Sequence, residues 1–84
     1  MSEAWVYVLR CGDGSLYTGW TNDLNRRIAR HTAGKASRYT ASRLPVELVA
    51  SWSMSDRSSA MREEMRIKRL PRTQKLALVQ SASA

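Results

Sequence analysis

Two short runs of aromatic and β-branched residues flank a Gly-Asp-Gly triplet near the start of the chain, in the sequence VYVLRCGDGSLYTGW of residues 6–20. Such runs are typical of β-strands, and glycines beside an aspartate between them are typical of a tight turn. We therefore predict strands over residues 5–9 and 15–20, joined as an antiparallel hairpin by a turn at residues 12–14.

The length of the hairpin loop decides on which faces of the sheet Tyr7 and Tyr17 lie. A two-residue loop would place them on opposite faces, because side chains alternate along a strand. A three-residue loop, with Gly14 at the left-handed bulge position, would place Gly19 opposite Tyr7 and both phenols on one face. The sequence leaves both registers open, and only the second lets the two hydroxyls serve one site.

The rest of the chain shows helical and extended patterns in turn. Asparagine and aspartate side chains suited to cap helices precede the helical segments. Pro45 cannot donate to a sheet, so it suits the first residue of a strand whose Val46, Leu48 and Ala50 share one face. The elements predicted after the hairpin are a helix over 22–32, a surface loop over 33–44, a strand over 45–52, and helices over 56–70 and 72–80.

The order ββαβαα predicts an α+β fold, with a three-stranded antiparallel or mixed sheet and helices packed against it. The sequence contains no repeat or low-complexity linker, so we expect one domain over residues 1–84 with a core at about 5–80. The tail at 81–84 is expected to be frayed.

Length and composition exclude several classes of protein. The 84 residues suffice for one small domain, and the longest uncharged apolar run, residues 5–9, is far too short to span a membrane. An acidic residue near the N-terminus differs from the positive start of a signal peptide. Cys11 is the only cysteine, so neither an internal disulfide nor a Cys/His zinc cluster is expected. We expect a cytoplasmic protein without a membrane partner.

The net charge of +7 points to a nucleic-acid partner, because 11 of the 14 basic residues are arginine. Arginine holds phosphate through a planar fork of donors, and small Arg-rich domains commonly bind nucleic acid. The alternative is a basic surface that serves solubility alone. A membrane-surface role is weaker still, because no predicted helix combines a wide apolar face with a basic one.

Helical spacing distinguishes the basic residues of the first helix. Since an α-helix turns once every ~3.6 residues, Arg27 and His31 border the apolar stripe of the helix, whereas Arg26 and Arg30 face solvent. Arg27 is either a snorkelling arginine or a cation held against the sheet for a phosphate. His31 is either a hydrogen-bonded residue at a helix end or part of a site.

The second long helix carries a carboxylate in an unusual place. Glu64 falls in the middle of a stripe formed by apolar residues at positions 60, 61, 65 and 67, whereas Glu63 lies off the stripe and is expected to be solvated. A carboxylate in such a stripe is costly unless it is paired or bound to a metal. Glu64 therefore either pairs with an arginine such as Arg27 or binds a hard divalent cation.

Together these polar residues suit phosphodiester cleavage. That reaction needs a base near the attacking water, a cation for the phosphoryl charge and a metal at the leaving oxygen. The candidate catalytic residues are Tyr7, Tyr17, Arg27, His31 and Glu64, with Glu64 also the candidate metal ligand.

These residues lie in recognisable motifs. The segments Trp5-Val6-Tyr7, Tyr17-Thr18-Gly19, TNDLNRRIARH, HTAGKASRYT and AMREEMRIKRL closely resemble the GIY-YIG nuclease superfamily, in particular small single-domain bacterial members related to the UvrC nuclease domain. The resemblance covers residues 5 to about 79. Three positions depart from the pattern: Trp5 replaces a glycine, Thr18 an isoleucine, and Trp20 a lysine of UvrC-type members.

The resemblance implies metal-dependent hydrolysis of nucleic acid and a role for each matching residue. Tyr7 and Tyr17 match the two motif tyrosines, one of which positions or deprotonates water. Arg27 matches the catalytic arginine, and His31 a position that is His or Tyr in relatives. Glu64 matches the metal-binding glutamate.

We therefore predict a Mg²⁺- or Mn²⁺-dependent endonuclease of low sequence specificity that acts on DNA in repair or recombination, with structured and single-stranded DNA as the candidate substrates. RNA stays open as a substrate, and we expect a monomer or weak dimer without a small-molecule cofactor. The alternatives are a nucleic-acid-binding module with weak or lost catalysis, and an adaptor for an acidic protein. Tyr39 either stacks on a base or pins its loop. The residues expected to hold the nucleic-acid backbone are Arg26, Arg30, Lys35, Arg38, Arg43, Arg62, Arg66, Lys68, Arg69, Arg72 and Lys75.

Overall fold

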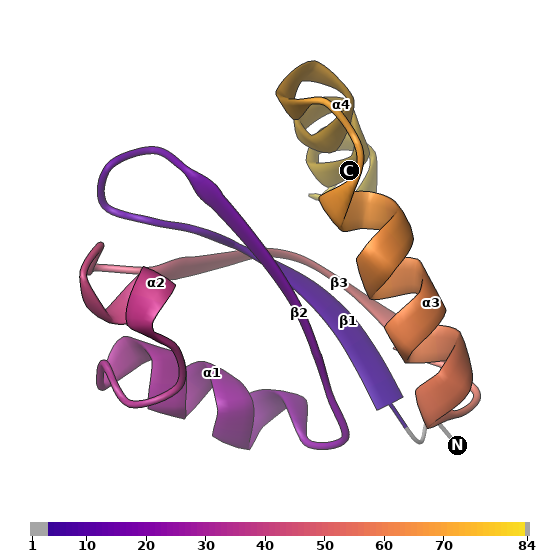
Figure 1. Ribbon diagram of the computed structural model, residues 1–84, viewed down its shortest axis with the longest axis horizontal. Coiled ribbons are helices and arrows are strands. Elements are labelled where there is room, and N and C mark those ends of the chain that lie inside the picture. Colours follow the sequence, from indigo (N-terminus) through magenta and orange to yellow (C-terminus); the bar gives the residue numbers. More distant parts are fainter. Residues whose placement is uncertain (1–3, 84) are drawn as a thin grey trace.

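A three-stranded antiparallel sheet with helices on both sides forms the structure, a computed structural model that describes residues 4–83 (Figure 1). The elements are β1 (Ala4–Arg10), β2 (Leu16–Thr21), α1 (Leu24–Thr32), α2 (Arg38–Ala41), β3 (Glu47–Met54), α3 (Arg57–Lys68) and α4 (Arg72–Ser83). The predicted α+β class is confirmed, and the sheet is fully antiparallel with strand order β2-β1-β3. None of the helices within residues 4–83 is long and apolar enough to cross a membrane.

The hairpin adopts the longer of the two loops considered. Tyr7 pairs with Gly19 across β1 and β2, and Cys11 N–H donates to the Ser15 carbonyl at 2.9 Å. Gly14 has φ of +85°, the left-handed conformation that glycine adopts without steric cost. Tyr7 and Tyr17 therefore lie on the same face of the sheet, as a shared site requires.

The third strand departs from the predicted alternation. Val8 of β1 pairs with Ala50, but the next residue, Leu9, pairs with Leu48, so Val49 is an extra residue in a β-bulge. The bulge reverses the alternation, and Leu48 is 40% exposed while Ala50 is buried. The expectation of one face for Val46, Leu48 and Ala50 is wrong for this reason. The strand also begins at Glu47, after Pro45 and not with it.

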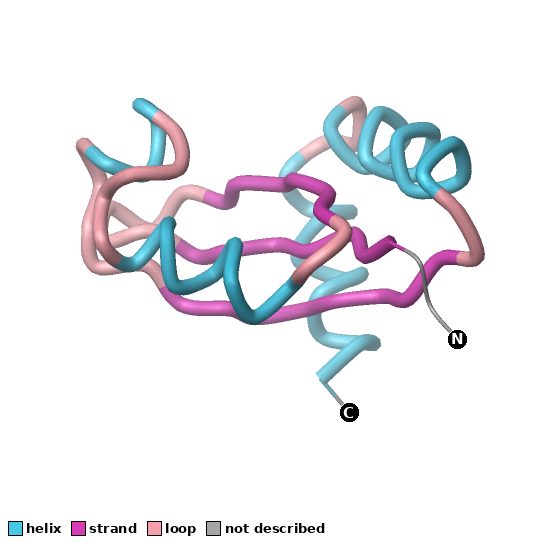
Figure 2. The backbone as a smooth tube through the Cα atoms, turned by 90° about the horizontal axis from the view of Figure 1, so that it is seen from below, coloured by secondary structure: helices cyan, strands magenta, loops and turns pink. Residues whose placement is uncertain are grey.

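The two faces of the sheet have different partners. One face packs against α3 and α4 and forms the apolar core. The other face carries Tyr7 and Leu9 and lies against α1, which crosses in front of the strands in Figure 2. Figure 1 shows the same arrangement, with α1 and α2 on one side and α3 and α4 on the other. The buried core residues are Ala4, Val6, Val8, Ala50, Ala60 and Ile67, with Leu16, Trp20, Val49, Trp52, Met54, Leu78 and Val79 packed around them.

Aspartate caps set the starts of two helices. The Asp23 carboxylate accepts from the Arg26 N–H, so α1 begins at Leu24, two residues after the predicted start. Asp56 caps α3 in the same way through the Ser59 N–H. The last helix continues to Ser83, so the tail expected to fray is helical over 81–83. Ala84 and the acidic N-terminal segment 1–3 lie outside the described residues.

The segment 33–44, expected to be a surface loop, contains the short helix α2. Ser37 caps it, because its hydroxyl accepts from the Thr40 N–H. Thr40 is fully buried, so part of this segment belongs to the interior of the protein.

Candidate active site

Tyr7 passes beneath Gly19, and this close approach depends on the missing side chain. Tyr7 is 1% exposed, and a Cβ atom added at Gly19 would lie 2.5 Å from the Tyr7 hydroxyl oxygen and 2.7 Å from Cζ. Real Cβ atoms do not come so close to other heavy atoms. Gly19 thus leaves the notch through which the Tyr7 hydroxyl meets the cleft described below.

A buried histidine is the hydrogen-bond partner of Tyr7. The Tyr7 hydroxyl oxygen lies 2.8 Å from Nε2 of His31, which has no exposed surface. Burial, and next the Arg27 charge, lower the pKa of His31, which favours the neutral ring. Burial, and next the neighbouring Tyr17, raise the pKa of Tyr7, so the phenol is neutral in the resting protein. The pair therefore consists of a neutral phenol and a neutral imidazole joined by one hydrogen bond.

Tyr17 continues a series of aromatic rings, packed edge-on or tilted against one another, from this pair toward α2. Its ring centroid lies 5.2 Å from that of His31 and 5.8 Å from that of Tyr39. The Arg43 guanidinium carbon lies 3.8 Å above the Tyr39 ring. Tyr39, 37% exposed, is thus packed between Tyr17 and Arg43, an arrangement that favours the loop-pinning alternative.

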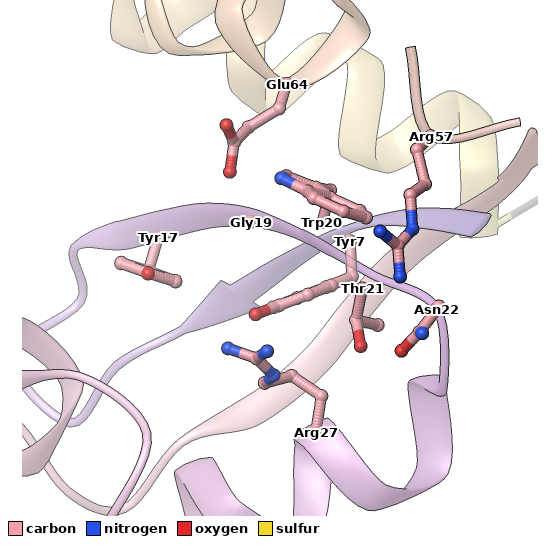
Figure 3. Close-up of a pocket in the computed structure, with 9 residues that line it drawn as sticks. All are labelled: Tyr7, Tyr17, Gly19, Trp20, Thr21, Asn22, Arg27, Arg57 and Glu64. Carbon is pink, nitrogen blue, oxygen red and sulfur yellow. The ribbon is translucent and has the colours of Figure 1, made fainter. Parts of the chain in front are cut away.

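A cleft at the edge strand β2 collects the candidate residues (Figure 3). Arg27 reaches it from α1 and Glu64 from α3, on opposite sides of the β2 ribbon, and the Arg27 guanidinium faces the Tyr7 hydroxyl. Arg27 is half-buried whereas Arg26 and Arg30 are exposed, as the helical spacing predicted. The residues lining the cleft are Tyr7, Tyr17, Gly19, Trp20, Thr21, Asn22, Arg27, Arg57 and Glu64.

Glu64 is half-buried for a different reason from the one expected. Met61 and Met65 are 48% and 51% exposed, so they do not belong to a buried stripe, and Glu64 borders the buried Ala60 and Ile67. The expectation that Glu64 lies in the middle of a buried stripe is wrong, because α3 packs against the sheet through Ala60 and Ile67 and leaves the methionine side of the stripe exposed. Of the ion pairs found within residues 4–83, Glu64 makes a loose one with Lys68, at 3.7 Å, and none with Arg27.

Glu63, unlike Glu64, makes a tight ion pair with an arginine. Arg66 donates to both of its carboxylate oxygens, at 2.7 and 2.8 Å, and this pairing lowers the pKa of Glu63. Glu63 is thus paired and not simply solvated. Its bidentate partner leaves Glu64 as the carboxylate that α3 offers to the cleft.

The donor set suits Mg²⁺ or Mn²⁺ shared with a substrate. Within the described part of the chain there is no group of three or more His, Cys, Asp or Glu side chains placed to enclose a metal. Mg²⁺ commonly binds through one or two carboxylates together with waters and substrate phosphates. Glu64, a carboxylate without a tight ion pair in a cleft lined by arginines, fits that mode of binding.

A second hollow extends the cleft along α1 and is strongly basic. It shares Thr21, Asn22 and Arg27 with the cleft, and adds Arg26 and Arg30, together with the capping residue of α1. Arg27 therefore lies between the candidate catalytic groups and two further guanidiniums. A chain of phosphates could follow this line.

The other predicted backbone-binding residues are dispersed, and several are engaged within the protein. Arg43 pairs with Asp13 of the hairpin turn at 3.1 Å, and Arg72 donates to the Gly14 carbonyl at 2.9 Å. Arg66 holds Glu63, as described. Lys35 and Arg38 line a separate hollow at α2, and Arg62, Lys68, Arg69 and Lys75 lie on or next to α3 and on α4.

Sequence reasoning missed Arg57, Asn22 and Thr40. Arg57 and Asn22 line the cleft, and Thr40 contacts the buried histidine. No feature of the neighbouring sequence distinguishes Arg57 from the other arginines. The short helix that carries Thr40 could have been predicted, because the hydroxyl of Ser37, three residues earlier, is suited to cap a helix.

Comparison with known proteins identifies the family of this chain. The family model of the GIY-YIG catalytic domain matches residues 3–77. The chain belongs to the GIY-YIG family. Its relatives include a UPF0213 protein of Halobacterium salinarum, 52% identical over 87% of this chain and 95% of that protein. A UPF0213 protein of Oceanobacillus iheyensis is 49% identical over 93% of this chain and 91% of its own length.

Two solved structures share the fold of this chain. The solution NMR structure of a UPF0213 protein from Bacillus halodurans has a TM-score of 0.64 at 44% identity, covering 96% of this chain and 86% of that one. The solution NMR structure of a protein from E. faecalis has a TM-score of 0.62 at 34% identity, covering 96% of this chain and 90% of that one. Sequence and fold therefore place the chain in the same family.

Proposed function

We propose that this GIY-YIG chain is a metal-dependent endonuclease that hydrolyses phosphodiester bonds in DNA. The observation that carries the proposal is the convergence of a buried Tyr7–His31 pair, Arg27 and Glu64 on one cleft at the edge of the sheet. A proton acceptor, a cation and a carboxylate are the groups that this hydrolysis requires.

The tyrosine–histidine pair is suited to move a proton. In the proposed reaction the Tyr7 oxygen takes a proton from the attacking water while its own proton passes to Nε2 of His31, 2.8 Å away. The transfer places positive charge on a ring that is neutral at rest and so avoids a buried phenolate with no partner. Tyr17 stands beside this pair at the cleft wall, where its hydroxyl can orient water or phosphate.

Arg27 and Glu64 have complementary tasks across the cleft. The Arg27 guanidinium stabilises the negative charge that develops on the phosphoryl oxygens. Glu64 would hold Mg²⁺ or Mn²⁺, and the ion when bound supplies Lewis-acid stabilisation of phosphoryl and leaving oxygens. Arg57 adds a second guanidinium to the cleft wall, and Asn22 adds an amide.

The surroundings of the cleft suit a substrate held by its backbone. Arg26 and Arg30 continue the cationic line from Arg27 along α1. Guanidiniums hold phosphates whatever the base sequence, so we expect low sequence specificity. The same contacts would accept RNA, which makes RNA a comparison substrate in the test.

A binding module with weak or lost catalysis is the second candidate. Trp20 lines the cleft at a position where UvrC-type members carry a lysine. The absence of that ammonium group favours weaker activity, while the remaining arginines would still bind phosphate.

Nicking assays decide between these candidates. Purified protein is incubated with plasmid, single-stranded and branched DNA, and with the corresponding RNA strands, in Mg²⁺ or in EDTA. We expect Mg²⁺-dependent nicking that falls by about 100-fold or more in Arg27→Ala and Glu64→Gln, the usual scale for losing one such group. Glu63→Gln is the matched control, because Glu63 is the neighbouring carboxylate and is held by Arg66.

Equal nicking by wild type, Arg27→Ala and Glu64→Gln would overturn the proposed site. Tight, salt-sensitive DNA binding without nicking in any metal would establish the binding module instead.

A further inference from the structure

Beneath the candidate site, His31 has a second buried partner that belongs to none of the roles assigned so far. Its Nδ1 atom lies 2.8 Å from the Oγ1 of Thr40, and both residues have no exposed surface. Thr40 is brought there by α2, whose cap, Ser37, is its neighbour: the two hydroxyl oxygens are 2.9 Å apart.

The contacts of the Thr40 hydroxyl with Ser37 leave its oxygen able to accept a hydrogen bond from His31. The Thr40 hydroxyl has one proton and two acceptors on Ser37, the hydroxyl oxygen at 2.9 Å and the carbonyl oxygen at 3.4 Å. If that proton goes to Ser37, the Thr40 oxygen is free to accept from Nδ1–H of His31. A neutral imidazole with its proton on Nδ1 has a lone pair on Nε2, and the Tyr7 hydroxyl can donate to it.

We propose that Thr40 is a positioning residue that holds His31 in the Nδ1–H tautomer, with Nε2 as an acceptor for Tyr7. The hydrogen bond made by one ring nitrogen of a histidine sets the state of the other. In this arrangement the chain of donation runs from Tyr7 to His31, from His31 to Thr40, and from Thr40 to Ser37.

The tautomer matters for the reaction because it decides whether His31 can receive a proton. With Nδ1 protonated, the Tyr7 O–H bond can break and an Nε2–H bond form, leaving an imidazolium and a phenolate oxygen that takes a proton from water. With Nε2 protonated, the ring donates to Tyr7 and has no lone pair there to accept. This consequence rests on the proposed function, whereas the tautomer itself does not.

The sequence makes the tautomer directly measurable, because His31 is the only histidine in the chain. Long-range ¹H–¹⁵N NMR spectra of the ¹⁵N-labelled protein distinguish a ring protonated on Nδ1 from one protonated on Nε2, without any signal from a second histidine. We expect the Nδ1–H pattern in wild type and in Thr40→Ser, which keeps the hydroxyl. Thr40→Val, which keeps the shape but has no acceptor, is expected to shift the ring to Nε2–H or to a mixture.

Nicking kinetics provide the second readout. Loss of such a supporting partner typically costs 10- to 100-fold, so we expect kcat of Thr40→Val to fall by about that factor with KM unchanged. Thr40→Ser should restore kcat to within a few-fold of wild type. A merely structural role would leave the tautomer of His31 unchanged.

A wild-type spectrum of the Nε2–H tautomer overturns the proposal, whether or not the protein cuts DNA. If wild type is inactive but shows Nδ1–H, the positioning role stands and the proposed function fails. Should Thr40→Val fail to fold, wild type and Thr40→Ser still decide: an Nε2–H pattern in either one contradicts the assignment.

Discussion

Tyr7 and Gly19 act together at the scale of single residues. The phenol occupies the volume in which any side chain at position 19 would lie, and its hydroxyl is held there by His31. Since sheet interiors disfavour glycine, a glycine in a central part of β2 is consistent with a close approach of another group. The notch is therefore a requirement of the site and a cost to the strand.

Substituting Gly19 with alanine should damage both folding and activity. The φ angle of Gly19 lies outside the left-handed region, so the backbone accepts alanine and the cost arises from contact with Tyr7. We expect the free energy of unfolding to fall by about 1–3 kcal/mol, the range for overpacking, measured by urea denaturation. Nicking should fall as well, because Tyr7 must move. Wild-type stability in Gly19→Ala would show that the phenol has room to shift.

At the scale of elements, α2 and the hairpin turn support each other. The Arg43 carbonyl accepts from the Gly12 N–H at 2.7 Å, and the Arg43 guanidinium pairs with Asp13. The same guanidinium donates to the Tyr39 carbonyl at 3.0 Å and stacks on the Tyr39 ring. These contacts position the short helix that carries Thr40, although a four-residue helix has little stability of its own.

Arg43→Ala should therefore differ from Arg26→Ala. We expect Arg43→Ala to lower the free energy of unfolding by about 1–2 kcal/mol, because it loses a partly exposed ion pair, two further hydrogen bonds and a cation–π contact. The salt dependence of its DNA binding should stay as in wild type. Arg26→Ala should keep stability and reduce the slope of log K against log salt by about one. Unchanged stability and a smaller salt slope in Arg43→Ala would instead show that Arg43 binds the nucleic-acid backbone.

At the scale of the whole molecule, the protein joins a basic surface to a cleft with one available carboxylate. The net charge of +7 favours association with a polyanion. The sheet core depends on apolar contacts between β1, β3, α3 and α4, with no enclosing metal cluster found within residues 4–83. Folding and metal binding should therefore be separable.

Metal removal tests that separation. We expect EDTA to abolish nicking and leave the Tm unchanged, since a single carboxylate with water ligands contributes little to the folded state without substrate. Circular dichroism melts with and without EDTA, beside nicking assays in the same buffers, provide the measurement. A clear fall of Tm in EDTA would mean that the ion also holds the fold.

Much of the site could be predicted because its signals are local. Helical spacing separated Arg27 from Arg26, and the family motifs marked Tyr7, Tyr17, His31 and Glu64. In the structure Tyr7, Tyr17, Arg27 and Glu64 line one cleft, and His31 supports it through its contact with Tyr7. The argument for Glu64 from a buried methionine stripe was wrong, since the exposure of Met61 and Met65 depends on how α3 docks.

The sequence by itself determined the identity of the strands and long helices, because apolar periodicity, aspartate caps and turn glycines act over a few neighbouring residues. The tertiary structure decided the hairpin register, the bulge at Val49, and the burial of Thr40 against His31. Each of these depends on contacts between distant segments, whose energies no local pattern contains. The placement of Tyr7 and Tyr17 on one face was thus a choice between two registers that only the pairing of β1 with β2 could make.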